Sequence, residues 1–133
     1  MDTTDTLLQD AARRLADIRD RMAKAARLAD RKPEETRLIA VSKTFGPEAI
    51  EPLLAAGQRL FGENRVQEAQ AKWPALREKY PDVELHLVGQ LQSNKAVDAV
   101  TLFDVIHSLD RSSLAQALAR AMEKTGRRPA CYV

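Results

Sequence analysis

Residues 37–50 read RLIAVSKTFGPEAI, and this stretch decides the fold. The apolar run Leu38–Val41 is typical of a buried strand. Gly46 and Pro47 are typical of the start of a helix, because proline fits the first helical turn. Between strand and helix lies Lys43, although lysine is among the residues least often buried. The stretch therefore predicts a strand, a polar turn that carries a lysine, and a helix.

The same strand–helix order repeats along the rest of the chain. Five short apolar runs are expected to be strands: LIAV (38–41), QRLFG (58–62), ELHLV (84–88), FDVIH (103–107) and ACYV (130–133). Helical patterns separate these runs, and Gly57 and Gly126 stand where helix C-termini are expected. This alternation predicts βαβ units and a parallel sheet. Before them, residues 4–29 show helical spacing of apolar residues and predict one long amphipathic helix.

Four complete strand–helix units and a fifth strand leave two architectures open. One is a small open α/β sheet, which the pattern alone slightly favours because the chain is about half the length of a typical barrel. The other is the first half of an eight-unit barrel. This second architecture explains why the last strand has no helix after it, since parallel sheets are normally covered by helices.

The composition narrows the class of protein. A chain of 133 residues with 44% hydrophobic and 30% charged residues is typical of one globular domain. The net charge of +2 comes from interspersed acids and bases, so no nucleic-acid partner is expected. Cys131 is the only cysteine, which suits a reducing compartment. With an acidic start and no long apolar run, neither a secretory signal nor a membrane span is expected, and the cytoplasm is the predicted location.

Ligands of parallel α/β folds bind at the carboxyl ends of the strands. Four such ends are polar here: Ser42-Lys43-Thr44, residues 62–65, residues 89–95 and residues 107–111. They are expected to ring a single pocket. No pair of histidines, cysteines or carboxylates has the spacing of metal ligands, so no metal is expected. A glycine-rich phosphate loop is also not found in the sequence.

Lys43 is the strongest candidate for chemistry at this edge. A lysine attacks an aldehyde only when its amine is neutral, and burial at a strand end favours that form. Alternatively, its side chain reaches out to solvent from the strand end. Position alone leaves both readings open.

The other candidates carry similar alternatives. Asn64 follows Gly62, which lets a ligand approach the backbone closely, but asparagine is also a common helix N-cap. Ser93 has the same two readings for the next helix. His107 lies at a strand end, whereas His86 lies within a strand and is expected to be a hydrogen-bonded core residue.

The segments LIAVSKT, GQRLFGENRVQEA, ELHLVGQLQSNK and FDVIHSLDR occur in this order and resemble the pyridoxal phosphate homeostasis protein family (YggS type). The resemblance covers nearly the whole chain. It implies a TIM-like (β/α)8 barrel of the kind found in the N-terminal domain of alanine racemase, and so decides for the half-barrel. Residues 1–32 are then the N-terminal helix region, and residues 37–133 are the strand–helix units of one barrel domain.

The resemblance also implies a cofactor. The lysine of the VSKT motif, here Lys43, carries pyridoxal 5′-phosphate (PLP) as a Schiff base, and the asparagine of the FGEN motif, here Asn64, lies at the cofactor. Ser93 and His107, at the rim of the same expected pocket, complete the predicted cofactor-binding set. Members of the family keep the supply of this vitamin B6 form in balance, and no robust catalytic activity is generally assigned to them. No catalytic residue is therefore expected.

This sequence departs from the family pattern in two ways. Phe45 stands where many members have a second lysine, Arg65 where an aromatic residue is frequent, and Gln90 where proline is common. Members also continue through four more strand–helix units, so the phosphate-holding loops and the arginine that faces the pyridine nitrogen are expected beyond Val133. The chain is accordingly expected to be a truncated part of a longer protein and to retain PLP weakly or not at all.

Two other functions stay open. The first is a PLP enzyme of the amino-acid racemase type, and the second is a cofactor-free interaction fragment. The complete fold is expected to be monomeric, whereas a half-barrel could associate through its unpaired strand edge.

Overall fold

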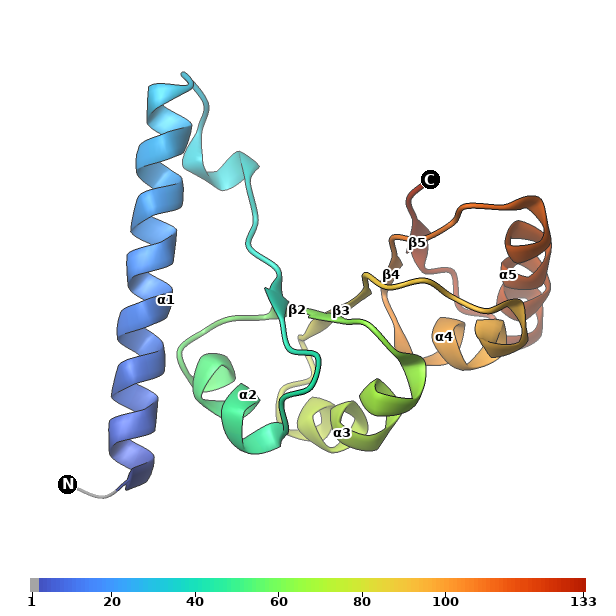
Figure 1. Ribbon diagram of the computed structural model, residues 1–133, viewed down its shortest axis with the longest axis horizontal. Coiled ribbons are helices and arrows are strands. Elements are labelled where there is room, and N and C mark those ends of the chain that lie inside the picture. Colours follow the sequence, from blue (N-terminus) through green and yellow to red (C-terminus); the bar gives the residue numbers. More distant parts are fainter. Residues whose placement is uncertain (1–2) are drawn as a thin grey trace.

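The computed structural model describes residues 3–133 and begins with a long helix that stands beside the rest of the chain (Figure 1). This helix, α1 (Thr3–Leu28), confirms the helix expected over residues 4–29. It contacts α2 (Pro47–Ala55) and the short helix η1 (Pro33–Glu35). Arg19 Nη2 on α1 donates a hydrogen bond of 2.7 Å to Gln58 Oε1. The helix therefore docks on the start of the strand–helix units.

Five parallel strands form one sheet in the order β1-β2-β3-β4-β5. The strands are β1 (Ala40–Val41), β2 (Leu60–Glu63), β3 (Glu84–Leu87), β4 (Val105–Ile106) and β5 (Ala130–Cys131). The helices between them are α2, α3 (Val66–Lys79), η2 with α4 (Ser93–Lys95, Ala96–Leu102) and α5 (Ser112–Thr125). Figure 1 shows α2 to α5 along one side of the sheet.

This topology decides between the two architectures. A doubly wound sheet reverses its strand order at a switch point and carries helices on both faces. A barrel keeps the strands in sequential order, with all helices outside. Here the order is sequential and the helices share one side. The expected half-barrel is confirmed, and the open-sheet alternative is wrong.

The core lies between the sheet and its helices. Phe61 pairs in register with Leu85, and Leu87 with Ile106, and all four side chains have 0% exposure. On α3, the ring of Trp73 packs on Phe61 with a centroid distance of 5.0 Å. Burying a side chain of this size contributes roughly 1.5–3 kcal/mol to stability. The core is thus built from every second residue of each strand, those whose side chains face the helices.

The other face of the sheet is open. Val41, Gly62 and His86 pair across neighbouring strands on this face. Val41 is 51% exposed, and Tyr132, just after β5, is 55% exposed. In a closed barrel, this face lines the interior. In residues 3–133 no helix covers it.

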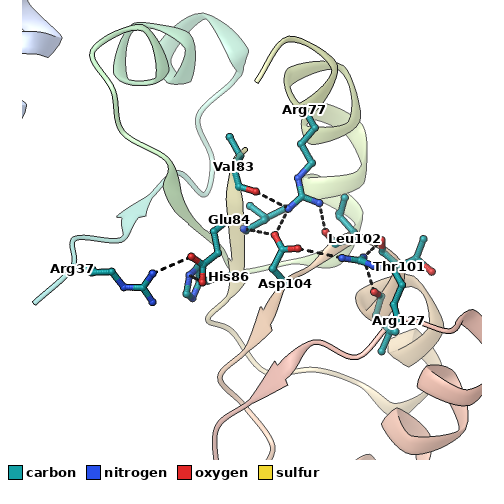
Figure 2. Close-up of polar contacts among 11 residues, drawn as sticks. Arg37, Arg77, Val83, Glu84, His86, Thr101, Leu102, Asp104 and Arg127 are labelled. Atoms are coloured by element: carbon teal, nitrogen blue, oxygen red, sulfur yellow. Dashed lines mark hydrogen bonds and ion pairs between the residues drawn. The ribbon is translucent and has the colours of Figure 1, made fainter. Parts of the chain in front are cut away.

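A cluster of charged residues joins α3, the start of β3 and the residues before β5 (Figure 2). The Asp104 carboxylate accepts hydrogen bonds from Arg77, from Arg127 Nη2 at 3.2 Å, and from the Leu85 N–H at 2.8 Å. Arg77 also donates to the Leu102 carbonyl at 2.7 Å. These bonds satisfy backbone groups at helix and strand ends, so the amino ends of β3 and β4 are held in place.

The strands are shorter than the apolar runs that predict them. The run 38–41, for example, pairs with β2 only at Ala40 and Val41. Helix α5 ends as expected at Gly126, whose φ of +75° is the left-handed conformation that glycine adopts most easily. None of the helices within residues 3–133 combines the length and the apolar character that a membrane span requires.

Candidate functional site

Lys43 lies in a tight turn after β1. The Phe45 N–H donates to the Ser42 carbonyl at 3.1 Å and closes the turn. Ser42 is buried under the helices at 4% exposure, but Lys43 itself is exposed. Of the two alternatives for Lys43, the structure therefore agrees with the one in which the side chain reaches solvent from the strand end.

Asn64 and Gly89 bring the turns after β2 and β3 into contact. A Cβ atom added to Gly89 would lie well within 3.0 Å of both the side-chain oxygen and the carbonyl oxygen of Asn64. Asn64 is half-buried and does not cap α3, whose N-cap is Arg65 without a side-chain cap bond. The capping alternative for Asn64 is therefore wrong. Instead, Asn64 borders a cleft of about 320 Å³ together with Gln90 and Lys95.

We expect the Gly89→Ala variant to lose about 1–3 kcal/mol of unfolding free energy, as overpacking typically costs. The Asn64 carbonyl belongs to the backbone, so it cannot rotate away from a new methyl group as a side chain would. Urea denaturation followed by circular dichroism measures the loss. Gly46→Ala is the matched control, because the atoms nearest to its methyl group would belong to the movable carboxylate of Glu48. Equal stability of the two variants would contradict the close contact.

His86 and His107 form a pair on the open face. His86 Nδ1 lies 2.8 Å from His107 Nε2, and His86 is only 3% exposed. His86 Nε2 lies 3.3 Å from Glu84 Oε1, outside hydrogen-bond geometry, and Glu84 is paired with Arg37 at 3.2 Å (Figure 2). The ring of His107 also lies against Tyr132, with centroids 5.1 Å apart. His86 is thus buried and hydrogen-bonded as the sequence predicts, but it lies on the open face of the sheet and not in the core against the helices.

Burial lowers the pKa of His86 below its ordinary value of 6.5, and the nearby His107 and Arg37 act in the same direction, whereas Glu84 and Asp104 oppose them. As the pH falls, the unfolded chain therefore takes up a proton at His86 at a higher pH than the folded chain does. The resulting stability is present above pH 6.5 and is lost as the pH falls through the lower folded-state value.

We expect thermal unfolding to reveal this proton uptake. Between pH 7 and pH 5, the melting temperature of the native chain should fall more than that of a His86→Gln variant, which cannot take up the proton. Differential scanning calorimetry at several pH values measures the slope of melting temperature against pH for the native chain and for the variant. Parallel slopes would contradict a neutral His86 in the folded chain.

The structure does not bring all predicted site residues to one cleft. His107 borders a cleft of about 400 Å³ together with His86 and Tyr132, whereas Asn64 borders the cleft beside Lys95. Ser93 is half-buried, starts η2 and accepts a hydrogen bond of 3.4 Å from Arg111. It does not cap α4, whose N-cap is Lys95. The single pocket expected from the sequence is therefore wrong for residues 3–133: Asn64 and His107 line different clefts.

The sequence reading missed a buried ion pair beside the Lys43 turn. Glu63 at the end of β2 and Lys72 on α3 lie 3.0 Å apart, with side-chain exposures of 0% and 6%. The signal was present in the strand alternation, because Glu63 shares the helix-covered face with Phe61. Lys72 lies four residues after Glu68 on the same face of α3, which indicates that the helix presents two charged groups in one direction.

Comparisons with known proteins agree with this geometry. The family described as "Alanine racemase, N-terminal domain" matches residues 14–133. The pyridoxal phosphate homeostasis protein of Escherichia coli (strain K12) is 43% identical over 112 residues, which are 84% of this chain and 48% of that protein. The protein of the same description from Aquifex aeolicus is 38% identical over 111 residues, with the same coverage of both chains.

Two solved structures are also similar. PipY of Synechococcus elongatus with PLP bound is 47% identical, with a TM-score of 0.76, over 91% of this chain and 52% of that one. A protein from Bifidobacterium adolescentis is 31% identical, with a TM-score of 0.84, over 98% of this chain and 55% of that one. This chain thus spans about half the length of the relatives that it matches. The chain belongs to the alanine racemase N-terminal domain family, and the two curated relatives described above are pyridoxal phosphate homeostasis proteins.

Proposed function

We propose that this chain is the PLP-binding half of a protein that takes part in PLP homeostasis in the cytoplasm, and that Lys43 bonds to the cofactor. The observation that supports this most is the likeness to PipY, whose structure was determined with PLP bound. The names of the curated relatives agree with it. When bound, PLP supplies an electrophilic aldehyde. The Lys43 amine attacks the aldehyde carbon, a C=N bond replaces the C=O bond, and water leaves.

The groups present at the strand ends fit this cofactor. Lys43 offers an exposed primary amine in the turn after β1. Asn64 offers an amide that both donates and accepts hydrogen bonds. Arg65 and Lys95 border the same cleft and carry the positive charge that attracts phosphate. Asn64 is proposed to contact the cofactor at this edge.

Ser93 and His107 are proposed as further cofactor contacts. They come from the loops after β3 and β4, on the same carboxyl edge as Lys43. His107 lines a cleft other than that of Asn64, so the two residues would touch different parts of a bound ligand.

Reductive trapping tests the role of Lys43. PLP is mixed with the chain, sodium borohydride reduces any C=N bond, and mass spectrometry of the digest locates the adduct. This detects even a weakly held cofactor, because reduction makes the bond permanent. We expect the adduct on Lys43 in the native chain and in the Lys79→Ala control, which removes an exposed lysine of α3 outside this cleft, and its loss in Lys43→Ala. Labelling spread evenly over all lysines would overturn the assignment.

We further propose that the protein holds PLP without robust turnover. Racemisation is the alternative, and it requires acid and base groups on both faces of a substrate carbanion. Incubation with PLP and L-alanine, followed by chiral chromatography, separates the two functions. Formation of D-alanine by the native chain but not by Lys43→Ala would overturn the proposal of a non-catalytic role.

A further inference from the structure

The turn that carries Lys43 has an unfavourable backbone conformation. Ser42 and Phe45 close the turn, which places Lys43 and Thr44 at its two central positions. Thr44 has a φ of +68°, in the left-handed region that β-branched residues rarely adopt. Glycine or asparagine is the usual residue at such a position. Other contacts must therefore hold this turn in its observed shape.

Those contacts come from one face of α3. Lys72 Nζ donates to the Ser42 carbonyl at 2.8 Å and to the Phe45 carbonyl at 2.7 Å. The Glu68 carboxylate accepts a hydrogen bond from the Thr44 N–H. This bond is the main reason why the pKa of Glu68 lies below its ordinary value. Both ends and the centre of the turn are thus bonded to side chains one helical turn apart.

The ammonium group of Lys72 is itself fixed by a buried carboxylate. Glu63 Oε2 lies 3.0 Å from Lys72 Nζ and also accepts hydrogen bonds from the Ser42 hydroxyl and, at 3.1 Å, from Trp73 Nε1. Glu68 Oε1 lies 3.3 Å from the same ammonium group. An ammonium group has only three N–H donors. Those of Lys72 are occupied by the Ser42 carbonyl, the Phe45 carbonyl and the Glu68 carboxylate. Lys72 has no donor left for a ligand.

We propose that Lys72 and Glu68 are positioning residues that hold the 42–45 turn so that the Lys43 amine extends from a fixed backbone at the carboxyl edge of the sheet. This inference rests on the proposed reaction of Lys43 with an aldehyde. Fixing one reactant in place raises the rate of such a reaction, and a misplacement of about 1 Å can lower it by about 100-fold. Lys72 and Glu68 act through the backbone of the turn and do not touch the cofactor.

The test removes the two bonds of Lys72 to the turn without leaving a buried charge. The Lys72→Met/Glu63→Gln variant replaces both charges, and the new glutamine oxygen still accepts from the Ser42 hydroxyl and Trp73. Glu68→Leu separately removes the bond to Thr44, and Glu68→Gln keeps an acceptor there. Lys79→Met is the matched control, because it removes a lysine of the same helix that pairs with Glu51 at 2.8 Å.

Two readouts distinguish a positioning role from a merely structural one. The first is the rate of borohydride-trapped PLP labelling at Lys43, relative to labelling at the exposed Lys24 of the same sample. We expect it to fall about tenfold or more in the double variant and in Glu68→Leu, and to stay native in Glu68→Gln and Lys79→Met. The second is amide hydrogen exchange at Thr44 and Phe45 by NMR, which needs no PLP and should become faster in the first two variants.

The outcomes separate the two proposals. If native chain shows no selective labelling of Lys43, the proposed function fails, and faster exchange at Thr44 and Phe45 in the variants still supports the role of Lys72 and Glu68 in holding the turn. Native labelling and native exchange in both the double variant and Glu68→Leu would overturn the positioning role. The melting temperature of each variant shows that the comparison is made on folded protein.

Discussion

We expect the Trp73→Ala variant to lose about 3–5 kcal/mol of unfolding free energy, the usual cost of truncating a large core side chain. Trp73 has 0% exposure, and its ring packs on Phe61 at an interplanar angle of 51°. Its Nε1–H also donates to Glu63, so the truncation both opens a cavity and removes a donor from a buried carboxylate. Trp73 is the only tryptophan, so urea denaturation is followed by circular dichroism rather than fluorescence.

A Trp73→Phe variant separates the two contributions. It keeps an aromatic ring on Phe61 but has no N–H for Glu63, so the expected loss is about 1.5–3 kcal/mol, the range for a hydrogen bond to a charged group. If Trp73→Ala were no less stable than Trp73→Phe, cavity formation would not explain the effect.

The second large effect is expected for Lys72→Met on its own. Removing one partner of a buried ion pair typically costs about 3–5 kcal/mol, because the other charge stays buried without its counter-ion. Here the stranded group is Glu63, which has 0% exposure and whose Oε1 has no hydrogen-bond partner among the described residues. Chemical denaturation at pH 7 measures the loss.

Two comparisons show whether burial is the cause. The pair of Lys79 with Glu51 is 64% and 41% exposed, and exposed pairs contribute little to stability, so Lys79→Met should be nearly neutral. The Lys72→Met/Glu63→Gln double variant should recover much of the stability that the single variant loses. Equal losses in Lys72→Met and Lys79→Met would show that the Glu63–Lys72 pair is not the source of the effect.

The elements of the fold were predictable, because apolar runs and helical patterns alternate clearly. Their ends were less predictable. Asn64 is a favoured capping residue, yet the N-cap of α3 lies one residue later, at Arg65, which has extended backbone angles of −130° and 134°. Capping depends on where the backbone turns into the helix, and the helical spacing of apolar residues does not locate that point to one residue.

The sequence predicted which strand ends carry the candidate site residues. It did not predict which side chains contact one another there. His86 and His107 are 21 residues apart, yet neighbouring strands bring His86 Nδ1 to 2.8 Å from His107 Nε2. The strand register decides this contact, and a one-residue shift would put the two side chains on opposite faces. Lys72 was missed because a charged residue on a polar helix normally faces solvent, and Glu63 because a carboxylate in a strand is seldom fully buried. Only the packing of α3 against β2 shows that the Lys72 side chain is buried beside Glu63.

Helix α1 contributes fewer buried side chains to the packing of the molecule than the other long helices, α3 and α5. Of its described side chains only Leu15 is buried, and the continuous core contains no described residue of α1. Amide protons of such a segment exchange through local detachment, which costs less free energy than global unfolding. The strand–helix units can therefore stay folded while α1 detaches and rebinds. The free energy of detaching α1 is accordingly lower than the free energy of unfolding the strand–helix units.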